Sequence, residues 1–279
     1  MTLNELKEAL RLGGIEAYEY EARELFYSVG KTPRSTPIFA NTTAESEPLF
    51  NAIARRLSGE PLQYIVGEVG FFRETYLVSP DCLIPRADTE ILVELAVKRL
   101  KNGADFLDLC TGSGCIAIST LKNTTNTTCR CADLSQNAFE MAKKNAKRNG
   151  VEKRLTPILA DVLTAEGRDL ITEGKTFDAI LSNPPYVSLS AYTTLEKEIY
   201  YEPRMAFVGG GEDGGDFYRI MTPLYLPYVK EGGFIAYEIG FDGAPIMEEV
   251  ARDNGLSLEI IKDYGANDRV AVLTSPTKR

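Results

Sequence analysis

From about residue 85 onward the sequence alternates short apolar strands with helical stretches. The predicted strands cover residues 106–109, 128–132, 155–159, 177–181, 234–239, 258–262 and 270–274. Helices are predicted between most of them, for example over 136–149. This order is typical of a Rossmann-like α/β domain with a mostly parallel sheet covered on both faces. The loop 263–268 is too short for a parallel crossover, so we expect the last strand to run antiparallel.

The first sixty residues have a different, helical period. Thr2 and Glu5 form a predicted capping box for a first helix, a second covers about 17–29, and a third presents Leu49, Ile53 and Leu57 on one face. We therefore predict a small helical bundle over residues 1–60 that binds a partner or covers the site.

Between the bundle and the sheet domain the period changes to that of strands. Residues 63–66, 69–72 and 75–78 predict a hairpin or small meander. The predicted organisation is thus a bundle over 1–60, a β-hairpin connector over 61–84 and an α/β domain over 85–279.

The residue types present exclude several mechanisms. The chain has no histidine, so Ser-His-Asp and Cys-His nucleophiles and histidine-ligated metals are excluded. Its five cysteines are an odd number and fit a reducing compartment. Four of them could be proposed as a thiolate metal site: Cys110, Cys115, Cys129 and Cys131. Because two flank a glycine loop and two lie on a predicted strand, we expect core residues and no metal.

The net charge of −9, from 40 acidic and 31 basic residues, favours a protein or small-molecule partner over nucleic acid. The nearest basic cluster, within residues 143–148, has the spacing of a solvated helix face. No segment approaches the roughly 18 apolar residues of a membrane span, and the N-terminus does not resemble a signal peptide. We expect a cytoplasmic monomer without membrane contact.

The stretch Ser182-Asn183-Pro184-Pro185-Tyr186 follows a predicted buried strand, at the end where open α/β sheets bind ligands. The two prolines make a stiff corner. The Asn183 carboxamide oxygen and a neighbouring backbone carbonyl can accept both hydrogens of one planar NH2 group, and Tyr186 offers a flat wall. The same residues could also be only a turn with a buried tyrosine.

A glycine loop, Cys110-Thr111-Gly112-Ser113-Gly114, connects another predicted strand to a helix. It lacks the third glycine of a dinucleotide fingerprint, so a nucleoside without a pyrophosphate fits better. Asp133, about 20 residues further on, can accept both ribose hydroxyls, and Asp161-Val162 can border the adenine. With Asp108 and Asn183, these acids are expected along one rim of the sheet.

Taken together, these motifs resemble class I S-adenosylmethionine-dependent methyltransferases that modify planar nitrogens, and within them the HemK-type release factor glutamine methyltransferases. The resemblance covers essentially the whole chain. Beside residues 182–186 it rests on 59–64, on Leu83 to Glu90, on 111–114, on Glu202-Pro203 with 210–215, and on 263–265 with 268–270. In this chain Cys110 stands where many members have glycine, Val162 where some have an aromatic residue, and Gly215 where a leucine often stands.

The resemblance implies methylation of a protein, on the side-chain nitrogen of the glutamine in the Gly-Gly-Gln loop of peptide chain release factors. It assigns cofactor contacts to Cys110, Thr111, Gly112, Ser113, Gly114, Asp133, Val162 and Asn183. It assigns substrate contacts to Asn183, Pro184, Pro185 and Tyr186, of which Asn183, Pro184 and Tyr186 would be catalytic. S-adenosylmethionine would be the cofactor and S-adenosylhomocysteine its product.

Our hypothesis for the reaction is that Asn183 and the Pro184 carbonyl accept the two amide hydrogens while Tyr186 packs on the amide plane. The nitrogen lone pair is thereby aimed at the methyl group. Residues 200–204 (Tyr200, Tyr201, Glu202 and Arg204 among them) could shape the substrate entrance or simply fill space. Two other functions stay open: an N-methyltransferase acting on adenine or guanine in RNA or DNA, and a binding protein without activity on the same scaffold.

Overall fold

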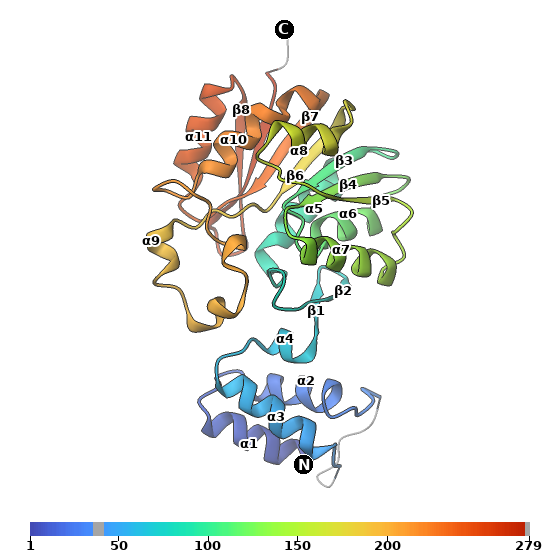
Figure 1. The fold of residues 1–279 in the computed structure, drawn as a ribbon, viewed down its shortest axis with the longest axis vertical. Coiled ribbons are helices and arrows are strands. Elements are labelled where there is room, and N and C mark those ends of the chain that lie inside the picture. Colours follow the sequence, from blue (N-terminus) through green and yellow to red (C-terminus); the bar gives the residue numbers. More distant parts are fainter. Residues whose placement is uncertain (36–41, 277–279) are drawn as a thin grey trace.

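Seven strands form one mixed sheet in this computed structural model, which describes residues 1–35 and 42–276 (Figure 1). They are β3 (Asp105–Leu109), β4 (Thr128–Asp133), β5 (Leu155–Leu159), β6 (Phe177–Ser182), β7 (Val229–Glu238), β8 (Ser257–Lys262) and β9 (Asp268–Thr274). Their spatial order is β5-β4-β3-β6-β7-β9-β8, and β9 pairs antiparallel with both of its neighbours. The α/β fold and the antiparallel last strand predicted from the sequence are confirmed.

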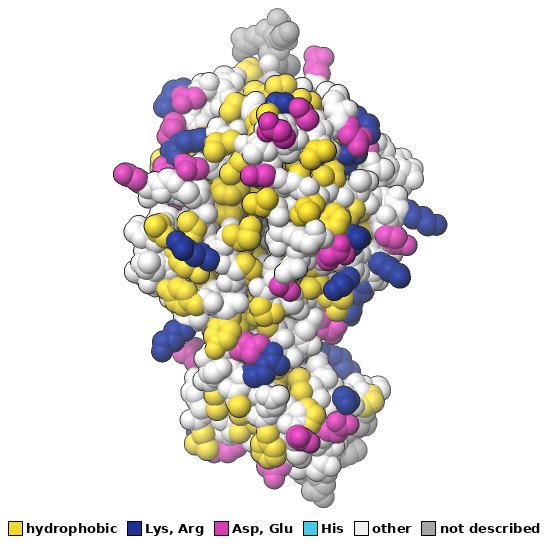
Figure 2. Space-filling view, viewed as in Figure 1, with side chains coloured by type: hydrophobic (Ala, Val, Ile, Leu, Met, Phe, Trp, Pro, Cys, Tyr) yellow, Lys and Arg dark blue, Asp and Glu magenta, His cyan; other side chains and the backbone are white. Residues whose placement is uncertain are grey.

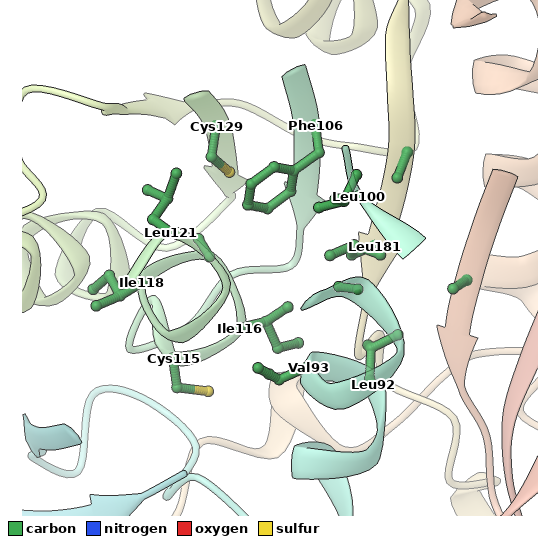
Figure 3. Close-up of a cluster of buried hydrophobic side chains, with 14 of the residues drawn as sticks. Leu92, Val93, Leu100, Phe106, Cys115, Ile116, Ile118, Leu121, Cys129 and Leu181 are labelled. Atoms are coloured by element: carbon green, nitrogen blue, oxygen red, sulfur yellow. The ribbon is translucent and has the colours of Figure 1, made fainter. Parts of the chain in front are cut away.

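Helices cover both faces of the sheet because successive strand residues point to opposite sides. The helices are α5 (Glu90–Arg99), α6 (Cys115–Lys122), α7 (Gln136–Arg148), α8 (Ala165–Thr172), α10 (Asp216–Tyr225) and α11 (Ala244–Asp253). Phe106 and Leu181 point to one face and pack with α5 and α6, as Figure 3 shows. Leu107 and Ile180 point to the other, toward α10 and α11. No helix in the described ranges is long and apolar enough to cross a membrane.

The cysteines proposed as an alternative metal site belong to these two cores. Cys115, Cys129 and Cys131 lie in the core beside α5 and α6, whereas Cys110 packs against the opposite one. Burial raises the pKa of each of the four thiols. The thiols therefore stay neutral and act as small apolar side chains.

The N-terminal helices are α1 (Leu3–Leu12), α2 (Tyr18–Ser28) and α3 (Ser46–Leu57). The Thr2–Glu5 capping box is present. The face expected for the third helix is partly wrong, because Leu57 is 44% exposed and the helix instead buries Leu49, Ala52 and Arg56. Arg56 can be buried because its guanidinium pairs with Glu21 at 2.6 Å.

Residues 63–66, expected as a strand, are helical and belong to α4 (Leu62–Val66). Pro61 precedes this helix, and Gly67 ends it in the left-handed conformation (φ 83°) that glycine adopts without strain. Leu62 and Ile65 pack into the N-terminal core. The hairpin itself is shorter and consists of β1 (Glu68–Phe71) and β2 (Glu74–Leu77).

The N-terminal helices contact the long loop that follows β6, which contains α9 (Leu189–Tyr192) and runs toward α4 (Figure 1). Arg56 reaches Glu198 of this loop at 2.8 Å, and the Tyr201 hydroxyl donates to the Ser58 carbonyl at 2.9 Å. Contacts with the first sixty residues thus hold the loop after β6 in place at residues 198–201.

Candidate active site

The predicted site residues meet at the carboxyl ends of adjacent strands. Leu109 of β3 pairs with Ser182 of β6, and Ser182 pairs with Tyr237 of β7. The next residue of each strand end is therefore Cys110, Asn183 or Glu238, side by side on one edge of the sheet. Open α/β sheets bind ligands at this edge.

A cavity opens at this edge between the loops after β3, β4, β5 and β6. Of the residues predicted to contact a cofactor or substrate, it is lined by Cys110, Gly112, Asp133, Val162, Asn183 and Pro185. Asp161 also lines it, as do Leu83, Met205 and Phe217 from other segments. Thr111 and Ser113 of the loop are buried, and Gly114 is the N-cap of α6.

The Asp133 carboxylate fastens the glycine loop and faces the cavity. Its Oδ2 accepts a hydrogen bond from the Gly112 N–H at 2.8 Å and its Oδ1 one from the Ser135 N–H at 2.9 Å. Burial raises its pKa, and these backbone hydrogen bonds oppose the shift. Each carboxylate oxygen can accept a second hydrogen bond, which suits a pair of neighbouring hydroxyl groups.

Asp108 lies behind the loop and does not line the cavity, contrary to the rim position expected from the sequence. It is fully buried, and its Oδ2 accepts hydrogen bonds from the Thr111 hydroxyl at 2.6 Å and the Ala117 N–H at 3.2 Å. Burial raises the pKa of this carboxyl to about 7. Asp108 therefore ties the loop to the start of α6.

The loop is also shaped by three left-handed residues. Gly112 (φ 56°) and Gly114 (φ 82°) adopt this conformation freely, but Cys110 (φ 59°) adopts it with a side chain. A side chain at Gly114 would come within 3.3 Å of Ala142 in α7. Gly114 therefore lets α6 and α7 approach closely.

The Asn-Pro-Pro-Tyr stretch turns away from β6 directly beside the cavity. Pro184 and Pro185 are buried, while Asn183 and Tyr186 are half-buried. The Asn183 Nδ2 donates to the Thr89 hydroxyl at 3.2 Å, so its Oδ1 points away from Thr89. The Tyr186 hydroxyl donates to Glu238 Oε1 at 3.3 Å.

A second cavity, of about 150 Å³, lies on the other side of Asn183. Asn183, Tyr186, Arg86 and Glu238 line it together with apolar side chains such as Leu83 and Phe207. Asn183, Leu83 and Ala206 line both cavities. An amide bound in the second cavity and a molecule bound in the first that transfers a group to it would therefore meet at Asn183.

Two glycines of a later segment pack closely against the tetrad, which is the Asn-Pro-Pro-Tyr stretch 183–186. A Cβ at Gly209 would lie 2.6 Å from the Pro185 carbonyl oxygen and 2.8 Å from the Tyr186 Cα. One at Gly214, which has a φ of 82°, would lie 2.3 Å from the Tyr186 carbonyl oxygen. The chain 209–214 thus needs glycine where it crosses the tetrad.

The residues expected near an entrance have mainly structural contacts. Glu202 is buried and accepts hydrogen bonds from the Ile84 N–H at 2.9 Å and from Arg86. Tyr200 donates to the Tyr192 carbonyl at 3.1 Å, and Arg204 stacks over the Tyr192 ring. Glu202 thereby attaches the segment before α5 to the loop after the tetrad.

Reasoning from the sequence missed Thr89 and Glu238, which contact Asn183 and Tyr186. Both are almost fully buried. Glu238 does give a signal in the sequence, since it is a carboxylate in the otherwise apolar run Phe234 to Ile239. Thr89 lies within residues 83–90, where the sequence pattern assigns it no role.

Parts of the chain match known protein families, and its fold matches a solved structure. Residues 87–212 match the family model "Methyltransferase small domain", and residues 2–67 match "PrmC N-terminal domain". A methyltransferase from Pyrococcus furiosus has a similar crystal structure, with a TM-score of 0.50 and 20% identity over 71% of this chain and 86% of that one. The fold is therefore one that methyltransferases have.

Curated relatives define the family further. A release factor glutamine methyltransferase from Moorella thermoacetica is 33% identical over 276 residues, which is 96% of this chain and 95% of that protein. One from Chlorobaculum tepidum is 34% identical over 236 residues, 82% of this chain and 79% of that protein. The chain belongs to the release factor glutamine methyltransferase family.

Proposed function

We propose that this protein transfers a methyl group from S-adenosylmethionine to the side-chain nitrogen of the glutamine in the Gly-Gly-Gln loop of peptide chain release factors. The observation that carries the proposal is the position of Asn183 between two cavities. One cavity has the polar groups for a nucleoside, and the other has the size and lining for a side-chain amide.

The first cavity is the proposed cofactor site. Asp133 would accept the ribose hydroxyls, Val162 would pack on the adenine, and Cys110 and Gly112 would lie along the nucleoside. Thr111, Ser113 and Gly114 would act by holding the loop. Bound there, S-adenosylmethionine supplies a methyl group on a positively charged sulfur, which an amide nitrogen can attack.

The second cavity is the proposed amide site. An amide nitrogen is a poor nucleophile because its lone pair is delocalised into the carbonyl. The Asn183 Oδ1 and the Pro184 carbonyl would accept the two amide hydrogens, Pro185 would keep the corner rigid, and Tyr186 would pack on the amide plane. Orienting the nitrogen in this way lowers the entropic part of the barrier and requires no strong base.

We also propose the division of the chain expected from the sequence: residues 1–60 bind the substrate protein, 61–84 connect, and 85–279 carry out the transfer. Two contacts support a role for residues 1–60 in placing the substrate protein near the site. They are the ion pair between Arg56 and Glu198 and the hydrogen bond from the Tyr201 hydroxyl to the Ser58 carbonyl. A protein held by the helices would thereby be presented to the loop that follows the tetrad.

The surface charge supports a protein substrate over a nucleic acid. On the face drawn in Figure 2, Lys and Arg side chains are interspersed with Asp and Glu. The molecule as a whole is acidic, at −9. A nucleic-acid-binding face would normally concentrate basic residues.

The test is to incubate the purified protein with methyl-labelled S-adenosylmethionine and an unmodified release factor, and to locate the label by peptide mass spectrometry. The control substrate is the same release factor with the Gly-Gly-Gln glutamine changed to asparagine, which keeps the amide group but shortens the side chain by one methylene. We expect label on the glutamine and none on the control. Label found only in total RNA, incubated in a parallel tube, would contradict the proposal and indicate a base methyltransferase.

A further inference from the structure

Glu238 is a buried carboxylate directly beside the tetrad. It is the last residue of β7, it is 2% exposed, and its Oε1 accepts a hydrogen bond from the Tyr186 hydroxyl at 3.3 Å. Its Oε2 is buried and accepts no hydrogen bond of standard geometry from residues 1–35 or 42–276. Burying a carboxylate oxygen without a hydrogen-bond partner costs free energy, so the side chains around Glu238 should offer something that offsets this cost.

Thr89 lies between this carboxylate and Asn183. Its hydroxyl oxygen accepts a hydrogen bond from the Asn183 amide at 3.2 Å. Burial raises the pKa of Glu238, and the Thr89 side chain is near enough to oppose that shift by favouring the charged carboxylate. Although Thr89 precedes α5, its hydroxyl makes no capping bond to that helix in the described chain. A structural cap therefore does not account for the hydroxyl.

The direction of these hydrogen bonds decides which way Asn183 faces. A hydroxyl has one hydrogen to donate, and an ionised carboxylate can only accept. If the Thr89 hydrogen goes to Glu238, only the lone pairs of Thr89 remain for Asn183. The amide NH2 of Asn183 must then face Thr89, and its Oδ1 must face the substrate amide.

We propose that Glu238 and Thr89 are positioning residues that fix the amide orientation of Asn183, and that Glu238 also fixes the ring of Tyr186 through its hydroxyl. This inference rests on the proposed function, in which the Asn183 Oδ1 accepts a hydrogen bond from the substrate amide. One carboxylate thereby orders two catalytic side chains from different positions of the same loop.

The orientation of Asn183 consequently depends on the charge of Glu238. Burial raises its pKa to about 7, while Thr89, Arg269 and Tyr186 favour the charged form and Asp88 opposes it. Arg269 is itself paired with Asp88 and Asp263, both at 3.1 Å. A protonated Glu238 could donate to Thr89 and reverse the chain of hydrogen bonds, so the transfer rate should fall as the pH is lowered through about 7.

The matched variants are Thr89→Val, which keeps the shape and removes the hydroxyl, and Thr89→Ser, which keeps the hydroxyl. We expect Thr89→Val to lower kcat by about 10- to 100-fold with cofactor affinity within about threefold, and Thr89→Ser to restore kcat to within about threefold. Glu238→Gln should lower kcat by about tenfold and remove the fall below pH 7. If Thr89→Ser is as slow as Thr89→Val, or if Glu238→Gln keeps the wild-type pH profile, the inference is wrong.

A second measurement does not depend on turnover. The side-chain amide signal of Asn183, identified in a nitrogen-15 spectrum by its absence in Asn183→Ala, should shift in Thr89→Val and keep its position in Thr89→Ser. An unshifted signal in Thr89→Val would contradict the inference. If the wild-type protein methylates no release factor, the proposed function fails, whereas these spectra still test the hydrogen bond.

Discussion

The two halves of the proposed site, a cofactor side and an amide side, are held in place by very different contacts. On the cofactor side, Asp108 accepts hydrogen bonds from residues 3 and 9 positions away in the sequence. The Gly112 N–H donates one to Asp133, at a separation of 21 positions. On the amide side, the partners of Asn183 and Tyr186 lie 94 and 52 positions away. The cofactor side is therefore nearly a local unit, while the tetrad depends on segments that only the complete fold brings together.

This difference predicts that the two halves fail separately. Changes behind the tetrad should slow transfer and leave cofactor binding nearly intact, whereas changes in the glycine loop should weaken cofactor binding. The following predictions start with the largest effect.

Gly209→Ala should disturb the tetrad most. Its Cβ would lie 2.2 Å from the Gly214 carbonyl oxygen as well as against Pro185 and Tyr186, so the backbone must move. We expect kcat to fall by about 100-fold, the free energy of unfolding to fall by about 1–3 kcal/mol, and cofactor affinity to stay within about threefold. Steady-state kinetics, denaturant unfolding and calorimetric cofactor binding measure the three quantities.

The matched control is Gly70→Ala in β1, where a Cβ meets no described atom within 4 Å. It should keep wild-type kcat. A Gly209→Ala variant as active as Gly70→Ala would show that the tetrad does not need this support.

Asp133→Asn should break the cofactor side. The carboxamide offers one accepting oxygen where the carboxylate offers two, so either the Gly112 N–H or the Ser135 N–H loses its acceptor. We expect cofactor affinity to fall by about 10- to 100-fold, which corresponds to about 1–3 kcal/mol, with kcat at saturating cofactor within about fivefold. Calorimetry that shows unchanged cofactor affinity would remove Asp133 from the proposed site.

Asp108 should make stability depend on pH. Its folded pKa of about 7 lies above the ordinary 3.8, so the folded protein binds an extra proton between about pH 4 and pH 7. Its contribution to stability is therefore greatest at low pH and is lost as the pH rises through 7. Relative to wild type, Asp108→Asn should gain about 4 kcal/mol between pH 4 and pH 8, because each pKa unit between 3.8 and 7 corresponds to about 1.4 kcal/mol.

Denaturant unfolding of both proteins across this pH range measures the difference. Glu238 has a similarly raised pKa and is present in both proteins, so its effect cancels. A difference between the two proteins that stays constant with pH would contradict a raised pKa for Asp108.

Cys110→Gly should have the smallest effect. Relief of a left-handed cysteine gains about 1–2 kcal/mol, while the added flexibility of glycine in the unfolded chain costs about 0.5–1 kcal/mol. Loss of the partly buried thiol offsets more of the gain, so the free energy of unfolding should change by less than about 1 kcal/mol. Denaturant unfolding tests this, and a loss above about 2 kcal/mol would mean that the thiol packs more tightly than its partly buried position implies.

The same difference explains what could be predicted from the sequence. The positions of the seven strands, the antiparallel last strand and the place of the two motifs at strand ends follow from local pattern and turn chemistry. Thr89 and Glu238 were missed because their partners are remote in sequence. Residues 63–66 were expected as a strand because their composition suits one, but Leu62 and Ile65 gain more by packing on the N-terminal helices.

Arg56 shows the same limit at the other end of the molecule. Its position on the buried face of α3 contradicts its residue type, and only the tertiary pairing with Glu21 and Glu198 explains it. Local pattern therefore predicts where the elements lie, while buried charge pairs between elements are visible only in the complete structure.

The most direct test of the account is the single-turnover rate of methyl transfer in Asn183→Ala with cofactor already bound, measured beside its cofactor affinity. Asn183 lies between the two cavities, and its loss removes an acceptor from the amide side. We expect transfer to slow by about 1,000-fold or more while cofactor affinity stays within about fivefold. A rate near that of the wild type, or a loss confined to cofactor affinity, would contradict the assignment of Asn183 to the substrate amide.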